Sequence, residues 1–337
     1  MSVMKDDGSF WWSGAAGIAS QDSQSPMTKD SPIYIASITK LYNATIIMRL
    51  YEEERLSLDD SMAKYLPEKL IDNIHVYNGK NYSNKITVKQ LLSHTSGIAD
   101  YYSEKPKGGK NLFEIFLDNP KQPWTVADTI ERTRNDLKPN FPPGTDASYS
   151  DTNFQLLGMI IESITRKPLH NVYEDIIFRP LGLEHTWLVN HSKNRNDRYV
   201  APADVFYKEK RINEIRSNGS YWADGGIIST AEEMIMFLKA LKEGRIIGKS
   251  TLESMHTWHK LHFPLEYGYG TMYFKLPRFI AKWMNLPPLW GHSGSTGSFL
   301  YYSENLDIYL AGTINQAESE SKPFFGLISK VLKAIKK

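Results

Sequence analysis

The chain has 337 residues, of which 41% are hydrophobic and 23% charged, enough for one large domain or two interlocked ones. The formal net charge of +2 gives no indication of a nucleic-acid partner, and the absence of cysteine excludes disulfides, thiolate metal sites and a cysteine nucleophile. No apolar stretch reaches the roughly 18 residues of a membrane span, and the polar start, Met1 to Asp7, lacks the apolar core of a signal peptide.

The first part of the chain predicts a strand and then a buried helix. The segment from Ser9 to Ser13 has strand character and ends in a glycine turn. After a polar loop, the apolar residues 33–35 lead at once into a helix pattern. Apolar side chains cover much of the circumference of that helix, so we expect it to be buried.

Residues from about 60 to 220 predict helices joined by long loops. Thr87 with Gln90 and Thr152 with Gln155 form capping-box patterns, each of which predicts the start of a helix. Ser229 is expected to cap a later helix in the same way.

The last third of the chain returns to strands. Residues 298–302 and 307–314 predict a hairpin joined by a polar turn. The segment ending at Ile335 predicts an amphipathic helix that packs on a sheet, with adsorption to a membrane surface as the alternative.

This order of elements predicts an α+β fold whose antiparallel sheet is assembled from both ends of the chain. Residues 1–60 and 220–337 would form an α/β domain with a central antiparallel sheet flanked by helices. Residues 61–219 would form an inserted, mainly helical lobe. We expect the active site to lie between the two parts.

Ser37 and Lys40 are the first candidates for covalent chemistry. They match the pattern Ser-x-x-Lys at the head of an apolar helix, where residues three apart share a face. Burial favours a neutral lysine, which could accept the serine proton. The same spacing recurs elsewhere in the chain, so a capping serine with a surface lysine is the alternative.

Two further segments have the residue types of a site. Tyr149 and Asp151 follow a Pro-Pro-Gly turn and precede a helix pattern. His292, Gly294 and Ser295 belong to a glycine-containing segment directly before a strand, and glycines permit close approach of a ligand to the backbone. Each residue alone would suit a structural role.

Together these segments resemble the penicillin-recognising serine hydrolases, which include class C β-lactamases, D-alanyl-D-alanine carboxypeptidases of the same fold and related esterases. The resemblance rests on Ser37-x-x-Lys40, on 91–98 (LLSHTSGI), on 141–144 (FPPG) leading to 149–153 (YSDTN), and on 292–294 (HSG). It covers nearly the whole chain. It implies a β-lactamase/transpeptidase-like fold and an acyl-enzyme formed on a small D-amino-acid peptide, an ester or a β-lactam, without cofactor or metal. It also implies a periplasmic or extracellular location, although this chain shows no signal peptide.

The resemblance assigns a role to each candidate. Ser37 is the nucleophile, Lys40 orients and activates it, and Tyr149 is the base in acylation. His292 contacts the substrate carboxylate or takes part in the proton network, and Gly294 lies beside it. The backbone N–H groups of Ser37 and Ser295 form the oxyanion hole. His94 is held outside the site as a structural residue.

The chain departs from the family pattern at three places. Asp151 replaces the usual asparagine, can only accept hydrogen bonds when ionised, and would keep Lys40 charged, which favours Tyr149 as the base. His292 replaces a lysine, which favours a peptidase or esterase over a β-lactamase. Few residues precede Ser9, so the start would be truncated or the sheet edge shorter.

The resulting prediction is a serine hydrolase of the D-alanyl-D-alanine carboxypeptidase or esterase type. A β-lactamase and a non-catalytic penicillin or peptide sensor are the alternatives. His256, His259 and His262 are spaced by three, which is the spacing of a possible metal site on a helix, but Pro264 interrupts the segment and the mechanism needs no metal. We therefore expect no metal.

Overall fold

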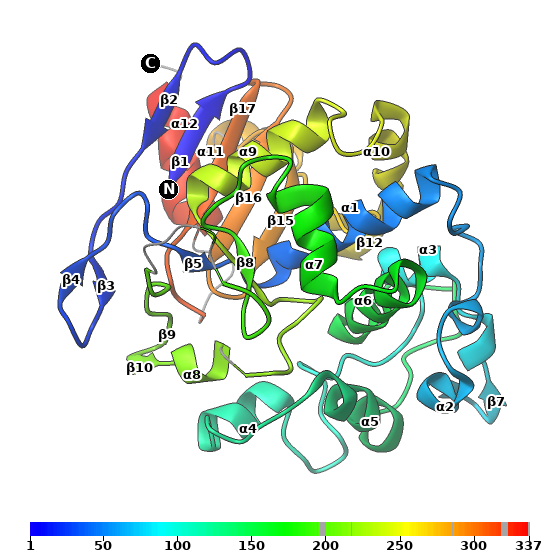
Figure 1. Ribbon diagram of the computed structural model, residues 1–337. Helices are drawn as coiled ribbons and strands as arrows, with labels where there is room; N and C mark the ends of the chain where they lie inside the picture. Colours follow the sequence, from blue (N-terminus) through cyan, green and yellow to red (C-terminus); the bar gives the residue numbers. More distant parts are fainter. Residues whose placement is uncertain (194, 196–199, 217, 285, 318–322, 336–337) are drawn as a thin grey trace.

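The computed structural model describes residues 1–337 apart from 194, 196–199, 217, 285, 318–322 and 336–337. Its centre is an eight-stranded antiparallel sheet in the order β12-β13-β14-β15-β16-β17-β1-β2 (Figure 1). The strands are β12 His259–His262, β13 Leu265–Tyr267, β14 Met272–Phe274, β15 Leu289–Gly294, β16 Ser298–Ser303, β17 Ile308–Thr313, β1 Ser2–Lys5 and β2 Trp11–Ser13.

The two ends of the chain meet in this sheet, as predicted. Strand β1 lies between β2 and β17, with Val3 opposite both Trp12 and Leu310. The strand expected at Ser9 to Ser13 is confirmed as β2, and the expected hairpin is confirmed as β16 and β17. Strand β1 itself was not predicted, because four residues are too few to show an alternating pattern.

Side chains alternate between the two faces of the sheet, and each face has its own helical cover. Leu300 and Tyr302 of β16 pack with helix α9 (Ala231–Lys242) and helix α1 (Thr39–Glu52). Phe299 and Tyr301 pack on the other face, with Ile328 and Leu332 near the C-terminus. The C-terminal helix α12 (Ser329–Ile335) is thus confirmed as a helix packed on the sheet (Figure 1).

Between residues 61 and 219, the described residues form mainly helices and long connections on the side of α1 (Figure 1). The helices there are α2 Glu68–Ile71, α3 Val88–Leu92, α4 Leu112–Asp118, α5 Val126–Asp136, α6 Asp151–Thr165, α7 Leu169–Tyr173 and α8 Asn213–Arg216, with the 3-10 helices η2 Met62–Lys64 and η3 Ser83–Lys85 and the π-helix η4 Glu174–Phe178. One apolar cluster runs from α1 and α9 into α6 and α7, so the helical part and the sheet share a core. The division at residues 60 and 220 stays a prediction.

Small sheets and connecting elements complete the fold. Strands β5 Ile33–Tyr34, β11 Ile227–Ser229 and β8 Trp187–Leu188 form a three-stranded sheet in the order β5-β11-β8. The remaining elements are β3 Ile18–Ser20, β4 Ser25–Pro26, the 3-10 helix η1 Ala36–Ile38, β6 Val76–Tyr77, β7 Lys80–Asn81, β9 Phe206–Tyr207, β10 Lys210–Arg211, α10 Lys249–Met255, α11 Arg278–Met284 and the π-helix η5 Pro323–Ile328. Within the described residues, no helix is both long and apolar enough to cross a membrane.

The capping predictions had different outcomes. The Thr87 box is confirmed, with the backbone N–H of Gln90 donating to Thr87 Oγ1 and the N–H of Thr87 donating to Gln90 Oε1. The Thr152 box is wrong, because α6 starts at Asp151 and the Thr152 hydroxyl donates to the carbonyl of Ala99. Ser229 belongs to β11, so the cap of α9 falls one residue later, at Thr230.

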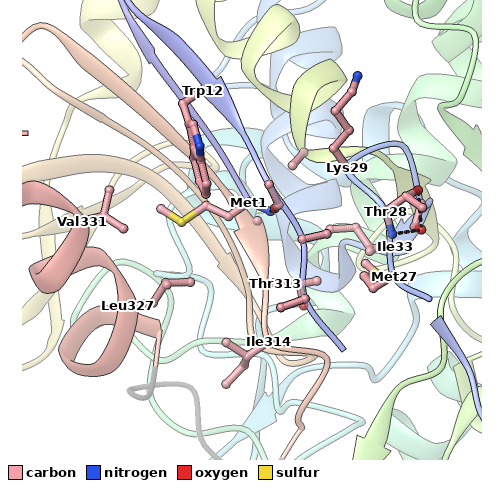
Figure 2. Close-up of a pocket in the computed structure, with 16 residues that line it drawn as sticks. Met1, Trp12, Met27, Thr28, Lys29, Ile33, Thr313, Ile314, Leu327 and Val331 are labelled. Atoms are coloured by element: carbon pink, nitrogen blue, oxygen red, sulfur yellow. Dashed lines mark hydrogen bonds between the residues drawn. The ribbon is translucent and has the colours of Figure 1, made fainter. Parts of the chain in front are cut away.

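A cavity of about 590 Å³ lies between the N-terminal strands and the C-terminal helix (Figure 2). Apolar side chains such as Met1, Trp12, Leu327 and Val331 form most of its wall. None of the predicted site residues lines it, so the candidate active site lies elsewhere.

Candidate active site

Ser37 lies in a sharp turn between β5 and α1. The preceding Ala36 has φ of 48°, in the left-handed region that residues with a Cβ rarely adopt. Ala36 and Ile38 are buried, whereas Ser37 is partly exposed. The turn therefore presents the hydroxyl of Ser37 at the surface of a pocket while its neighbours anchor it in the core.

Gly294 allows the end of β15 to lie directly against this turn. A Cβ at Gly294 would overlap the carbonyl oxygen of Ile35 and the side chain of Ser298. The hydroxyl of Ser298 donates to the carbonyl of Ile35 at 2.9 Å, and the hydroxyl of Thr296 donates to that of Tyr34 at 2.7 Å. These contacts bring the glycine-containing segment and Ser37 together, as predicted from the sequence.

Lys40 is fully buried and points at Ser37. Its Nζ lies 3.1 Å from Ser37 Oγ, 2.6 Å from the carbonyl oxygen of Asp224 and 2.6 Å from Asp151 Oδ1. Burial lowers the pKa of Lys40, but the negative charges of Asp151 and Asp224 outweigh it and raise that pKa above the ordinary value. The interpretation of Lys40 as a surface lysine is therefore wrong, and a neutral lysine does not agree with this ion pair.

Tyr149 completes this side of the site just before α6. Its ring centre lies 5.1 Å from Lys40 Nζ, a distance at which the ring face attracts the ammonium. The ring also contacts the tilted ring of His94, with 4.3 Å between the ring centres, and meets Tyr267 edge-on at 5.8 Å. Ser37, Lys40 and Tyr149 therefore belong to one cluster.

His94 supports the segment that bears Tyr149. It is buried just after the end of α3, and its Nδ1 accepts the backbone N–H of Ser150 at 3.1 Å and lies 3.2 Å from Asn153 Nδ2. Burial lowers the pKa of His94, and the charge of Lys40 acts in the same direction. A buried, neutral imidazole in these contacts agrees with the structural role assigned to His94 from the sequence.

His292 does not reach the pocket surface. Its side chain is 0% exposed, with Nε2 3.0 Å from the hydroxyl of Tyr267. Burial lowers the pKa of His292 to about 3, and Lys40 contributes in the same direction, so the ring is neutral at pH 7. The predicted contact between His292 and a substrate carboxylate does not agree with this placement, because the ring is both buried and uncharged. Its part in a proton network stays a prediction.

A pocket of about 280 Å³ opens in front of Ser37. The predicted residues Tyr149, Asp151, Gly294 and Ser295 line it together with Ser37. Its volume is just below the usual range for ligand sites, which suits a small substrate. Sequence reasoning missed the other lining residues, which are Asp100, Tyr102, Ser103, Leu261, His262, Leu265, Met272 and Ser293. The first three directly follow the family-like stretch 91–98, which could have indicated them.

Two buried carboxyl groups accompany Asp151. Burial raises the pKa of Asp100 to about 7, and the charge of Asp151 adds to this effect. Burial and Asp151 likewise raise the pKa of Asp224 to about 6, against the opposing charge of Lys40. Asp151 and Asp224 both raise the pKa of Lys40, and Asp151 is the carboxylate in direct contact with its amine, at 2.6 Å. No local sequence pattern indicated Asp224.

The spaced histidines do not lie on one helix. Helix α10 ends at Met255, so His256 follows it, while His259 and His262 belong to β12. Among the residues with a described placement, no group of three histidine or acidic side chains is arranged to hold a metal ion.

The comparison with protein-family models agrees with this geometry. The family model described as Beta-lactamase matches residues 3–326 of the chain. The chain belongs to the beta-lactamase family. The predicted resemblance to penicillin-recognising serine hydrolases and the predicted α+β fold are thereby confirmed.

Relatives of this beta-lactamase family member include penicillin-binding and peptidase-like proteins. Penicillin-binding protein 4 of Amycolatopsis lactamdurans is 29% identical over 172 residues, which are 51% of this chain and 40% of that protein. A putative D-alanyl-D-alanine carboxypeptidase of Escherichia coli K12 is 34% identical over 155 residues, 45% of this chain and 32% of that protein. The matched part is thus less than half the length of either relative.

Among solved structures, a D-stereospecific amidohydrolase from Streptomyces sp. matches with a TM-score of 0.75 and 27% identity. The match covers 97% of this chain and 92% of that one. The chain therefore has the fold of a serine hydrolase family whose members include carboxypeptidase-like and amidase-like proteins.

Proposed function

We propose that the chain is a serine hydrolase that forms an acyl-enzyme at Ser37 and cleaves small D-amino-acid peptides, amides or esters. The observation that supports this most is the contact of Lys40 Nζ with Ser37 Oγ at 3.1 Å and with Asp151 at 2.6 Å, beside the pocket that Tyr149 lines. The printed names of the carboxypeptidase-like and D-stereospecific relatives support the substrate class.

In the proposed acylation, Ser37 Oγ bonds to the carbonyl carbon of the substrate and its proton passes to a Tyr149 phenolate. The charged Lys40 cannot accept that proton, but its ammonium favours the phenolate and orients the serine. The carbonyl oxygen becomes an oxyanion, which the backbone N–H groups of Ser37 and Ser295 would stabilise.

The same phenol would complete the cycle. As the bond to the leaving group breaks, Tyr149 returns the proton to the departing nitrogen or oxygen. A water molecule then attacks the carbonyl carbon of the acyl-enzyme ester and gives a proton to Tyr149. Tyr149 passes that proton to Ser37 Oγ as the bond between Oγ and the carbonyl carbon breaks. No step requires a metal or cofactor.

Labelling of Ser37 tests this proposal. A fluorophosphonate probe should label the chain, and peptide mass mapping should locate the adduct at Ser37. Ser37→Ala should abolish labelling, whereas Ser250→Ala, at an exposed serine near the start of α10, should leave it unchanged. A protein that retains its fold and is not labelled at Ser37 would contradict the proposal.

A substrate panel separates the alternatives. An N-acyl-D-alanyl peptide, the matching amide, a p-nitrophenyl ester and a chromogenic cephalosporin would be compared at equal enzyme concentration. We expect turnover of the D-amino-acid compounds, because the carboxypeptidase-like and D-stereospecific relatives support that substrate class. Preferential turnover of the cephalosporin would instead indicate a β-lactamase, and a stable adduct without turnover would indicate a sensor.

A further inference from the structure

The hairpin of β12 and β13, at the edge of the eight-stranded sheet, forms one wall of the candidate active-site pocket. Three of its residues line the space that contains Ser37, namely Leu261, His262 and Leu265. Met272 of the adjacent strand β14 adds a further apolar side chain to this wall. A substrate held at Ser37 would therefore lie against the hairpin.

A β-bulge directs two consecutive residues of β12 towards this space. Lys260 pairs with Glu266 in the regular register. The register then shifts, so that His262 pairs with Leu265 and Leu261 is the extra residue. Successive side chains of a regular strand point to opposite faces of the sheet, whereas a bulge re-aims one of them. The bulge explains why Leu261 and His262 can both line the pocket.

The apolar side chains of this wall belong to one surface. Leu261 and Leu265 are partly exposed, and Met272 is 8% exposed. All three belong to the apolar cluster against which Tyr149 also packs. A single partly exposed leucine needs no explanation, but three apolar side chains in a hollow beside a nucleophile have the character of a binding surface.

The backbone holds this surface in place. Leu265 pairs with Phe274 of β14, and the N–H of Lys275 donates to the carbonyl of Pro264 at 3.2 Å. Phe263, in the turn between the two strands, is 72% exposed and continues the apolar surface beyond the pocket. The hairpin is thus anchored both along β13 and at its turn, so a ligand would meet a preformed wall.

The rest of the pocket has the opposite character. Its polar part includes Asp100, Tyr102, Ser103 and Asp151. A residue with a polar amide or ester and a large apolar side chain would match both parts of the lining. The methyl group of D-alanine would leave much of the apolar wall in contact with water, whereas a leucine or phenylalanine side chain would remove more of it from water.

We propose that Leu261, Leu265 and Met272 form a side-chain subsite that selects D-residues with a large apolar side chain, such as D-leucine or D-phenylalanine, over D-alanine. The selected residue is the one whose carbonyl Ser37 attacks, because its Cα is bonded to that carbonyl carbon and a simple amide or ester has no other side chain. This inference rests on the proposed function and names its substrate class.

Two p-nitrophenyl esters with the same leaving group test the subsite. N-acetyl-D-leucine p-nitrophenyl ester and the matching D-alanine ester would be compared by kcat/KM from release of p-nitrophenol, after subtraction of spontaneous hydrolysis. We expect a preference of about 10-fold or more for the leucine ester, because one additional methylene in an apolar pocket is already worth about that factor.

Substitutions in the hairpin should lower this preference without removing activity. Leu261→Ser and Leu265→Ser should each lower the ratio of the two kcat/KM values about 3-fold or more, the effect of roughly one buried methylene, mainly through the leucine ester. Labelling of Ser37 by the fluorophosphonate should persist in both variants. Leu306→Ser is the matched control, because Leu306 is a partly buried leucine of the same cluster that does not line the pocket. We expect it to leave the ratio unchanged.

The outcomes separate this inference from the proposed function. If Ser37 of the wild-type chain is labelled, equal turnover of the two esters, faster turnover of the alanine ester, or turnover of neither would overturn the subsite. A ratio that both hairpin variants leave unchanged would also overturn it. Failure of the fluorophosphonate to label Ser37 in the wild-type chain would instead reject the acyl-enzyme, and the subsite with it.

Discussion

The pair of Lys40 and Asp151 gives the sharpest prediction, because replacing the carboxylate leaves a buried ammonium without its counter-charge. At the 2.6 Å separation and an effective dielectric constant of about 20, the attraction is about 6 kcal/mol. Asparagine keeps an acceptor oxygen, and Lys40 keeps the Asp224 carbonyl. We therefore expect Asp151→Asn to lower the free energy of unfolding at pH 7 by about 3 kcal/mol, the lower end for breaking a buried pair.

The pH dependence of this loss provides a second test. The pKa of Lys40 is raised in the folded wild type, so its contribution to stability is complete below the unfolded value of about 10.4 and is lost as pH rises through the folded pKa. In Asp151→Asn the pKa of the buried amine falls, so its penalty is largest at neutral pH and disappears towards alkaline pH. The stability difference between the two proteins should therefore narrow as pH rises from neutral, first through the lowered pKa of the variant and then through the raised pKa of the wild type.

Urea unfolding at pH 7 and pH 10.5 provides the assay. Glu114→Gln is the control, because Lys105 and Glu114 are also 2.6 Å apart but are 52% and 39% exposed, so a far smaller loss is expected. Lys40→Met and the double variant complete a cycle. A loss for Asp151→Asn no larger than that for Glu114→Gln, or additive losses in the cycle, would refute the reasoning.

Two further predictions concern the pocket. Gly294→Ala should abolish labelling of Ser37, because the added methyl group would overlap the carbonyl of Ile35 and push β15 away from the nucleophile turn; labelling at the wild-type rate would contradict this. The folded protein retains the proton of Asp100, whose pKa is about 7, while the unfolded chain releases it near pH 4. Its contribution to the free energy of unfolding therefore falls between about pH 4 and pH 7 and is constant above that. Urea unfolding at several pH values should show that Asp100→Asn makes the free energy of unfolding depend less steeply on pH over this range. An unchanged pH dependence would contradict the raised pKa of Asp100.

The parts of the site that could be predicted from sequence are those held by local geometry. Ser37 and Lys40 are three residues apart at the start of a helix, so the helix itself brings them together. The close approach of Gly294 to the turn that bears Ser37 could be expected, because a glycine between polar residues ahead of a strand lets another segment come close to its backbone. In the same way, the hairpin of β16 and β17 follows from its pattern alone.

The parts that could not be predicted depend on contacts between distant segments. Arg216 meets Ser295 across 79 residues, and no pattern near either residue indicates the pair. The sequence likewise contains no measure of the burial of His292, which decides that its ring is neutral. The Thr152 cap was wrong for the same reason, because a contact with Ala99, 53 residues away, takes its hydroxyl.

The placement of β1 between β2 and β17 has a consequence for synthesis on the ribosome. Ser37 emerges early, but Ser295 and the strand that pairs with β1 emerge about 260 residues later, a delay of roughly 10 to 50 s at ordinary translation rates. During that interval the apolar helix α1 lacks part of its cover. The nascent chain therefore passes through a long period in which chaperone binding or aggregation competes with folding, and Gly294 can pack against the turn that bears Ser37 only after that interval.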